Sequence, residues 1–344
     1  MIEFFRILPD YILQPERFPI ALLAMVLVAL VGIATGPLWR NANPFLWLII
    51  DKIFGGISAR LDRRHRQGLD LFIRGLIITL VAAVFAALLG LAASHLAYRH
   101  PYGGLTEIAL LSPLIAGGAV WKILLVLYRA LKLNGKKVEK GAYLNIVRST
   151  RIDLSSADDF TITRAGMGYA ARVFDKGVVA PIFWYLIGGL PLAYLYAGLA
   201  ALSWRFGRDG FTKGFGQTAL AFEQIAGFIP HILSAFLLAV AGSLTPTGGV
   251  TRGFIGIFRR KGCAPYAEGG VPVTVMAHAL KVSLGGPVQD LDGSTLKRAW
   301  VGPDRATAQL EGGHLRRALY MGWVAYLLYM AAIMGLMTAL GWLF

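Results

Sequence analysis

The chain alternates long apolar runs with strongly polar segments. Six stretches are almost entirely apolar, at residues 19–36, 75–97, 105–128, 177–204, 227–244 and 318–344. An α-helix needs roughly 20 such residues to cross the hydrocarbon core of a bilayer. The runs are continuous and lack the alternation of membrane β-strands. The pattern therefore predicts an all-α polytopic membrane protein, residues 1–344 forming one membrane domain with about six transmembrane helices plus interfacial and cytoplasmic helices.

The composition narrows the class further. Of the 344 residues, 56% are hydrophobic and 15% are charged, whereas soluble proteins average about 45–50% and about 25%. This excludes a soluble enzyme and a disordered chain, and the single cysteine, Cys263, excludes a disulfide scaffold. No nucleic-acid-binding module is present. We expect the net charge of +15 to reflect membrane orientation, with the lipid bilayer and other membrane protein subunits as partners and no nucleic acid.

Charge in the polar segments predicts the orientation. Segments 40–74, 129–176 and 245–317 hold 27 of the lysines and arginines, and the alternate segments hold six. Cytoplasmic loops carry the excess of basic residues. The three basic loops are therefore predicted to be cytoplasmic and both termini non-cytoplasmic. In this interpretation Arg205, Arg208 and Lys213 lie on the non-cytoplasmic side.

Some segments need separate interpretation. The run 177–204 contains Gly188, Gly189 and Pro191, which membrane helices tolerate where neighbours satisfy the backbone. It is either one kinked span, which we favour, or a re-entrant pair of half-helices that returns residues 205–224 to the cytoplasm. Segment 43–66 is amphipathic and basic, which predicts a helix on the cytoplasmic interface. Asp158 and Asp159 are typical of a helix start, and a short helix is expected near 273–282.

Common catalytic and metal-binding motifs are missing from the sequence. It has no phosphate loop, no dinucleotide motif and no zinc-protease motif, and none of its six histidines lies three or four residues from another. We therefore predict no metal site. Charges at membrane depth are costly and usually functional, and the sequence has Lys122 and Glu223 there. Lys122 is expected to extend along its stem to the interface, and Glu223 to begin a helix.

One segment carries a specific resemblance. Residues 177–196 read GVVAPIFWYLIGGLPLAYLY and resemble the hallmark segment of the CobD/CbiB family, membrane proteins that act as adenosylcobinamide-phosphate synthases. Further matches keep the family's order: Asn43-Pro-Phe-Leu-Trp-Leu-Ile, Arg164-Ala165, Gly227-Phe-Ile-Pro230, Leu284-Gly-Gly-Pro287 and Trp300-Val-Gly302. The resemblance covers roughly residues 20–340 and implies the bacterial cytoplasmic (inner) membrane. It also implies an ATP-dependent amide ligase that joins cobyric acid, a corrinoid, to an aminopropanol or its phosphate, with Mg²⁺.

The sequence departs from the family at its acidic motif. Those motif positions fall on Gly168, Arg172, Val173, Phe174 and Lys176, so two glutamates, an asparagine and an aspartate are missing. Asp175 and Glu223 are the remaining weak catalytic candidates, although a shift of one residue on a helix turns a side chain by about 100°. We therefore predict a catalytically degenerate member that uses no cofactor. ATP and Mg²⁺ would be needed only if the synthase activity were retained.

Basic residues in place of acids favour an anion or an acidic partner. The predicted binding residues are Arg164, Arg172, Lys176, Gly285 and Gly286, in a cytoplasmic pocket between residues 164–176, Glu223 and the loop 284–287. Arg172 and Lys176 are four apart and so share one face of a helix. Three functions remain open: an active or altered synthase, a non-catalytic accessory or structural subunit of a membrane complex, and an AmpE-like membrane sensor or regulator.

Overall fold

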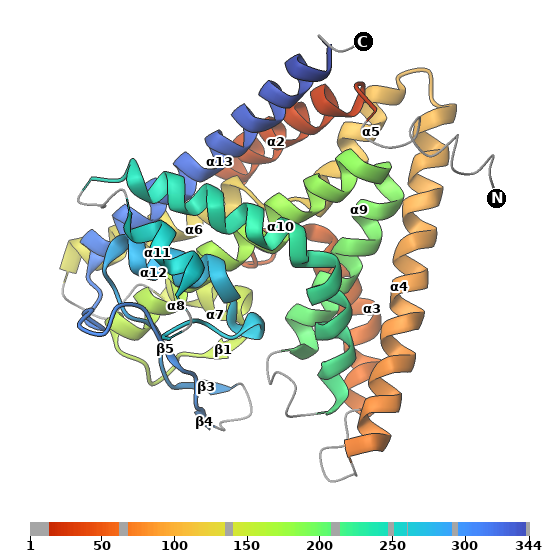
Figure 1. Ribbon diagram of the computed structural model, residues 1–344. Coiled ribbons are helices and arrows are strands. Elements are labelled where there is room, and N and C mark those ends of the chain that lie inside the picture. The colour runs from red at the N-terminus through yellow and green to blue at the C-terminus, as the bar shows by residue number, and fades with distance from the viewer. Residues whose placement is uncertain are drawn as a thin grey trace.

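The computed structural model describes residues 14–61, 68–134, 140–207, 214–246, 251–259, 261–290 and 295–341 (Figure 1). Its α-helices are α2 (Arg17–Thr35), α3 (Phe45–Leu61), α4 (Gly68–Arg99), α5 (Gly103–Leu111), α6 (Gly118–Asn134), α7 (Lys140–Thr150), α8 (Asp159–Phe174), α9 (Ala180–Phe206), α10 (Gln217–Ser243), α11 (Arg252–Phe258), α12 (Gly270–Leu280) and α13 (Gly312–Gly341). The short strands are β1 (Ile152–Asp153), β2 (Leu284–Gly285), β3 (Val288–Asp290), β4 (Thr295–Leu296) and β5 (Trp300–Val301). The predicted all-α class is confirmed.

The apolar runs became the long helices. Five helical stretches are long and apolar enough to cross a membrane, at Arg17–Thr35, Gly68–Arg99, Asp159–Phe206, Gly214–Ser243 and Gly312–Ala339. A sixth arises if α5 with the short helix η1 (Ser112–Leu114) and α6, which meet at a bend of 41°, count as one span. This agrees with the six predicted runs. The bend follows Pro113, whose ring cannot continue an α-helix without strain.

Helix α9 is broken where the sequence predicted an interruption. Gly188 (φ −135°, ψ 19°) and Gly189 (φ 69°, ψ −159°) are not helical, and Figure 1 shows α9 changing direction between its two arms. The positive φ of Gly189 is one that glycine adopts at little cost. At the break, Arg17 Nη1 donates a hydrogen bond to the Ile187 carbonyl at 3.1 Å. A membrane span tolerates such a break only where a neighbour satisfies the freed carbonyls.

The returning arm of α9 corrects one expectation. Arg205 Nε lies 2.9 Å from Asp51 Oδ1, and Trp204 Nε1 donates to the Ser149 carbonyl at 3.0 Å. Both partners belong to the basic segments 40–74 and 129–176, so Arg205 lies beside these segments and not opposite them. The predicted placement of Arg205 on the side opposite these segments is therefore wrong. Arg208 and Lys213 lie outside the described residues.

Helix α3 has part of its apolar face covered by protein. Its buried side chains pack on α9 and α4, with the Trp47 and Trp204 ring centroids 6.0 Å apart and those of Phe54 and Phe85 5.6 Å apart. The predicted amphipathic helix is thus present, with part of its apolar surface packed on α9 and α4 and with Phe45, Ile53 and Ile57 exposed. Residues 62–66 of the predicted segment lie outside the described residues.

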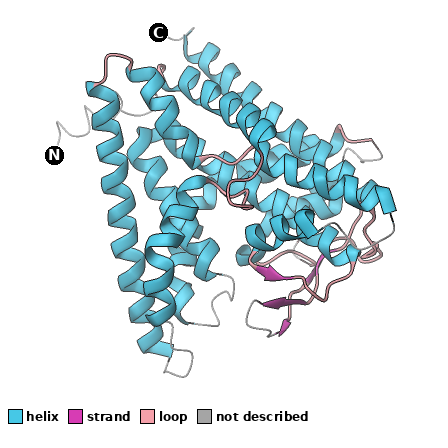
Figure 2. Ribbon diagram, turned by 180° about the vertical axis from the view of Figure 1, so that it is seen from behind, coloured by secondary structure: helices cyan, strands magenta, loops and turns pink. Residues whose placement is uncertain are grey.

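Small antiparallel strands gather at one end of the molecule (Figure 2). Strand β3 pairs with β1 (Ile152 with Asp290) and with β4 (Gln289 with Thr295), and β2 pairs with β5 (Gly285 with Trp300). The strands hold the polypeptide between α12 and α13 against α8. The predicted helix start is confirmed, because Asp158 caps α8 by accepting from the Thr161 N–H at 2.9 Å. The Thr161 side chain and then its backbone N–H, both close to the carboxylate, lower the pKa of Asp158.

Candidate functional site

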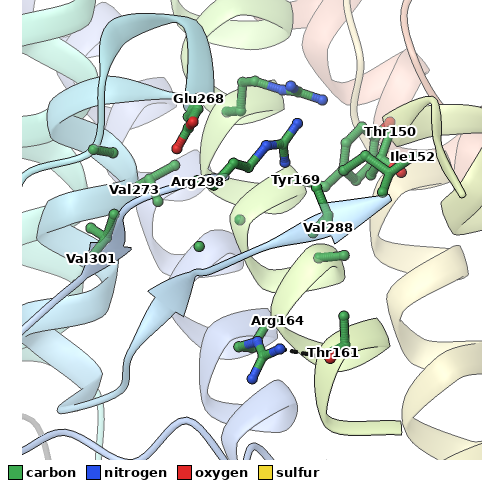
Figure 3. A pocket seen from close by; sticks show the side chains of 15 residues that line it. Thr150, Ile152, Thr161, Arg164, Tyr169, Glu268, Val273, Val288, Arg298 and Val301 are labelled. Carbon is green, nitrogen blue, oxygen red and sulfur yellow. Dashed lines mark hydrogen bonds between the residues drawn. The ribbon is translucent and has the colours of Figure 1, made fainter. Parts of the chain in front are cut away.

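Helix α8 presents one polar face to a pocket. Thr161, Arg164, Gly168 and Arg172 recur at intervals of three or four residues, which places them on one side of a helix. All four line the pocket, and Figure 3 shows the Thr161 and Arg164 side chains of this face joined by a hydrogen bond. Two of the four, Gly168 and Arg172, are positions where the family resemblance implies carboxylates. An ideal Cβ placed on Gly168 would meet no atom within 4 Å, so the pocket is open at that position.

The strands and the turn before α12 form the other walls. The lining residues are Thr150, Ile152, Thr161, Arg164, Ala165, Gly168, Tyr169, Arg172, Ala264, Glu268, Val273, Gly285, Val288, Arg298 and Val301. The space between their atoms, including the open mouth, measures about 580 Å³. Arg164, Arg172 and Gly285, predicted from separate segments, therefore lie around one hollow.

Arg164 is fixed in place on one wall. Its Nη1 donates to the Ala308 carbonyl at 3.1 Å and its Nη2 donates to Thr161 Oγ1 at 2.6 Å. The guanidinium carbon lies 4.9 Å from the ring centroid of Trp300, a distance typical of a cation–π contact. Arg164 Nε is buried and has no hydrogen-bond partner. The side chain is thus held rigidly while one donor remains unused.

The charged side chains among the described lining residues of the pocket are arginines, with one exception. Arg172 and Arg298 also line it, and Glu268 is the one carboxylate among its described lining residues. Burial raises the pKa of Glu268, and the nearby Arg298 opposes that rise. Glu268 Oε2 is buried without a hydrogen-bond partner. Three guanidinium groups and one carboxylate leave the pocket with a net positive charge.

The two predicted glycines act through the backbone. Gly285 and Gly286 have φ values of +75° and +80°, in the left-handed region that favours glycine. A Cβ on Gly285 would lie 2.3 Å from the Ala299 carbonyl oxygen, and one on Gly286 would lie 2.7 Å from the Trp300 ring. Gly285 lines the pocket and Gly286 packs beneath Trp300. Side chains at either position would displace β5 and the wall that it forms.

Lys176 has a different environment from Arg172. Its Nζ lies 2.6 Å from Glu223 Oε2, with the Lys176 side chain 5% exposed and the Glu223 side chain fully buried. Tyr196 and Tyr266 donate to Glu223 Oε1 at 3.1 and 2.8 Å, and Ser203 donates to Oε2 at 3.3 Å. Lys176 Nζ also lies 4.2 Å from the Tyr266 ring centroid. Lys176 therefore neutralises Glu223 inside the helical bundle and does not line the pocket with Arg172.

Asp175 is engaged in a second buried contact. Its Oδ2 lies 2.6 Å from His231 Nδ1, and the Ser234 hydroxyl donates to its Oδ1 at 2.8 Å. His231 Nε2 accepts from the Val271 N–H at 3.1 Å. Since an imidazole nitrogen that accepts carries no proton, His231 is neutral and its proton lies on Nδ1, where it is donated to Asp175. Residues 175–179 form a π-helical turn, a rare conformation that is frequent at functional sites.

These contacts occupy both weak catalytic candidates. Glu223 has four donors, Asp175 has two, and neither carboxylate lines the pocket. Among the described residues, no group of three or more His, Cys, Asp or Glu side chains is placed to hold a metal ion. Asp175 and Glu223 are thus committed to buried contacts, and Glu268 is the one carboxylate among the described lining residues.

Several site residues escaped the sequence-based prediction. Arg298, Glu268, Tyr169 and Thr150 line the pocket from four different elements, and no local pattern connects them. His231 and Ser234 are three residues apart on α10, which was a usable signal for one shared helix face. Their common partner, Asp175, lies more than 50 residues earlier and could not be identified from spacing.

Comparison with known proteins assigns the scaffold. A family model described as CobD/Cbib protein matches residues 23–321. The chain is 28% identical over 310 residues to the cobalamin biosynthesis protein CobD of Sinorhizobium sp, covering 87% of this chain and 92% of that protein. It is 27% identical over 238 residues to CobD of Klebsiella pneumoniae (69% and 72%), and 27% identical over 229 residues to CbiB of Salmonella typhimurium (62% and 69%). No solved structure matches.

Proposed function

The chain belongs to the CobD/CbiB family of membrane proteins related to cobalamin biosynthesis, and from this premise we propose that its pocket binds an anionic ligand without metal-assisted ligation. The observation that carries the proposal is the exchange of charge at the pocket. Gly168 and Arg172 occupy positions where the family resemblance implies glutamates, and both line the hollow together with Arg164 and Arg298. The chain matches the family over most of its length, but at Gly168 and Arg172 the acidic side chains that the family resemblance implies are replaced by a glycine and a cation.

The donor set suits a phosphate or a carboxylate. A guanidinium group offers two parallel N–H donors to such an anion and keeps its charge at all physiological pH values. The hydroxyl groups of Thr150 and Tyr169 donate to the Ile146 carbonyl and to Asn43 Oδ1, so the guanidinium groups are the donors that carry this argument. The ligand class is therefore an anion of modest size, either free or carried as the acidic group of a corrinoid precursor or of a partner protein.

The same donor set does not suit the ATP and Mg²⁺ that the family activity implies. Mg²⁺ requires near-octahedral coordination by oxygen, usually from one or two carboxylates together with phosphates and water. Glu268 is the one carboxylate lining the described pocket, which three arginines also line, and Asp175 and Glu223 are held by His231 and Lys176. The described lining residues therefore do not support an Mg²⁺-assisted ligation step in this pocket. An accessory or sensing role uses the pocket only to bind.

Complementation tests the proposal. This chain and the Salmonella typhimurium CbiB relative are expressed from one vector in a strain that lacks its cobinamide-phosphate synthase. We expect the relative to restore corrinoid synthesis and this chain to fail, although immunoblotting shows it in the membrane fraction. Purified protein is expected to bind sulfate, measured by calorimetry, and not to hydrolyse ATP.

Two results would contradict the proposal. Restored corrinoid synthesis would show that ligation is retained, and Glu268, Asp175 and Glu223 would be mutated first. A failure to bind sulfate or pyrophosphate would remove the anion-binding role itself.

A further inference from the structure

We refer to the pocket lined by Arg164, Arg172 and Arg298 as the arginine pocket. A second hollow lies apart from it, between the α2–α3 connection, α3 and α7. Trp39, Asn41, Asp51, Lys52, Arg148 and Trp204 are among its lining residues, and the space between its atoms, including the open mouth, is about 980 Å³. None of these six residues lines the arginine pocket. We refer to this hollow as the Trp39 cleft.

The Trp39 cleft carries positive charge that the protein does not neutralise. Asp51 is engaged by Arg205 Nε at 2.9 Å and by Arg151 Nη1 at 3.5 Å. Lys52 and Arg148 are both exposed, and within the described part of the chain no carboxylate lies within ion-pair distance of either. An anion entering the cleft therefore meets two cations whose charge is available.

The rim of the cleft is a turn held in an unusual conformation. Trp39 and Arg40 have φ values of +50° and +62°, a region that residues other than glycine seldom adopt and that is often found at binding sites. Arg148 Nη1 donates to the Trp39 carbonyl at 3.0 Å, and Asn41 Nδ2 donates to the Arg148 carbonyl at 3.3 Å. The turn presents the Trp39 side chain, 62% exposed, at the mouth. Tryptophan is the side chain typical of the boundary between water and lipid.

An apolar groove continues from the cleft along α2. Asn41 and Leu48 line both hollows. The groove runs between Leu27, Val31 and Gly36 of the α2 side and Ala109 of the α5 side. Leu27 and Gly36 are nine residues apart, which is about 14 Å along a helix. This is close to half of the roughly 30 Å hydrocarbon core, the depth reached by one acyl chain within a single leaflet.

We propose that the groove and the Trp39 cleft together bind one anionic phospholipid of the surrounding bilayer. The acyl chain lies along α2, the phosphate lies between Lys52 and Arg148, and Trp39 packs at the level of the glycerol. Basic side chains near a membrane surface select anionic over zwitterionic headgroups. The apolar groove would contact the acyl chain of a lipid. Free phosphate has no acyl chain and would gain nothing from the groove.

Native mass spectrometry of the purified full chain in non-ionic detergent tests this. Phosphatidylglycerol and phosphatidylcholine with the same acyl chains are titrated separately. We expect tighter binding of phosphatidylglycerol, about fivefold weaker binding in Lys52→Gln, and about 25-fold weaker binding in Lys52→Gln/Arg148→Gln, with phosphatidylcholine unaffected. The matched control, Lys132→Gln/Arg305→Gln, removes two exposed cations that line neither hollow and should bind as the unmodified chain does.

Two single variants keep the test decisive, because Arg148 also supports the turn and the double variant could fail to fold. Lys52→Gln removes an exposed charge alone, and Ala109→Phe fills the groove and should weaken both lipids. Equal binding of the two lipids by the unmodified chain, or unchanged binding in Lys52→Gln, would overturn the proposal, as would competition by inorganic phosphate at the lipid's own concentration. Arg172→Gln in the arginine pocket should keep the lipid preference, so this test is independent of the proposed function.

Discussion

Arg172 in the arginine pocket and Lys176 in the buried network are four residues apart in the sequence, but they differ in burial and in the groups around them. The arginine pocket holds Arg172 and two further guanidinium groups around an open space with one carboxylate. The buried network holds Lys176, 2.6 Å from the Glu223 carboxylate, and Asp175, 2.6 Å from the His231 ring nitrogen that donates to it. The comparison teaches that four residues of spacing do not make two cations equivalent. Burial and the identity of the partner decide which charge is enclosed in the helical bundle and which lines a pocket.

Removal of Glu223 should give the largest effect, because it breaks the buried network. Glu223→Ala leaves Lys176 charged and unpaired inside the bundle, which costs about 3–5 kcal/mol of folding free energy when a buried pair loses one partner. The measurement is the unfolding transition in detergent, followed by circular dichroism. Glu268→Gln, which changes a carboxylate in the pocket, serves as the control and should shift the transition little.

A second variant sharpens this result. Lys176→Met/Glu223→Leu removes both charges together, and replacement of a buried pair by apolar groups is often close to neutral. We expect it to recover most of the stability that Glu223→Ala loses. A double variant as unstable as the single one would show that the tyrosine contacts, and not the ion pair, hold this region together.

Removal of Arg172 should weaken ligand binding and leave the stability of the fold nearly unchanged. Arg172→Gln takes one guanidinium from the pocket, and because a hydrogen bond to a charged group is worth about 1.5–3 kcal/mol, sulfate affinity should fall by about 10- to 150-fold. The unfolding transition should move little. Arg305→Gln, an exposed arginine outside the lining, is the control for both calorimetry and unfolding. Unchanged sulfate binding would place the anion elsewhere.

The smallest expected effect is a pH dependence of sulfate affinity that arises from Glu268 in the pocket. Burial raises the pKa of Glu268 above its usual value, so this carboxylate gains a proton earlier than an exposed one as the pH falls. The protonated form is neutral, and the net charge of the pocket then rises. Sulfate, whose own charge is constant in this range, should bind about threefold more tightly at pH 5 than at pH 7.5. Glu268→Gln should bind equally at both pH values; a persisting difference would assign the titration to another group.

Local signals in the sequence were enough for the membrane helices and for part of the pocket. The long apolar runs had no other stable arrangement, and Arg164 and Arg172 share a face of α8 because eight residues separate them. The break at Gly188 and Gly189 was also visible, because these residues interrupt an apolar run. In each of these cases the deciding information lies within a few turns of one helix.

Long-range pairing could not be predicted in the same way. The approach of Lys176 to Glu223 and of Asp175 to His231 joins the end of α8 to α10, and nothing near either residue specifies its partner. The cost of burying a charge in a membrane indicated that Glu223 needed a partner, but not which one. Arg205 was misplaced for a related reason. Counting spans assigns sides correctly only if each apolar run crosses once without a break, and α9 is broken at Gly188 and Gly189.

The break in α9 also has a consequence for the order in which the chain assembles. The Ile187 carbonyl at the break is satisfied by Arg17 of α2, and the returning arm lies against Gly90 of α4, where a Cβ would meet Pro191 at 2.7 Å. Both partners precede α9 in the sequence, so the ribosome has already released them when the two half-helices emerge. The chain thus synthesises these two supports of its most irregular span before the span itself, and the Ile187 carbonyl need not wait for any later segment.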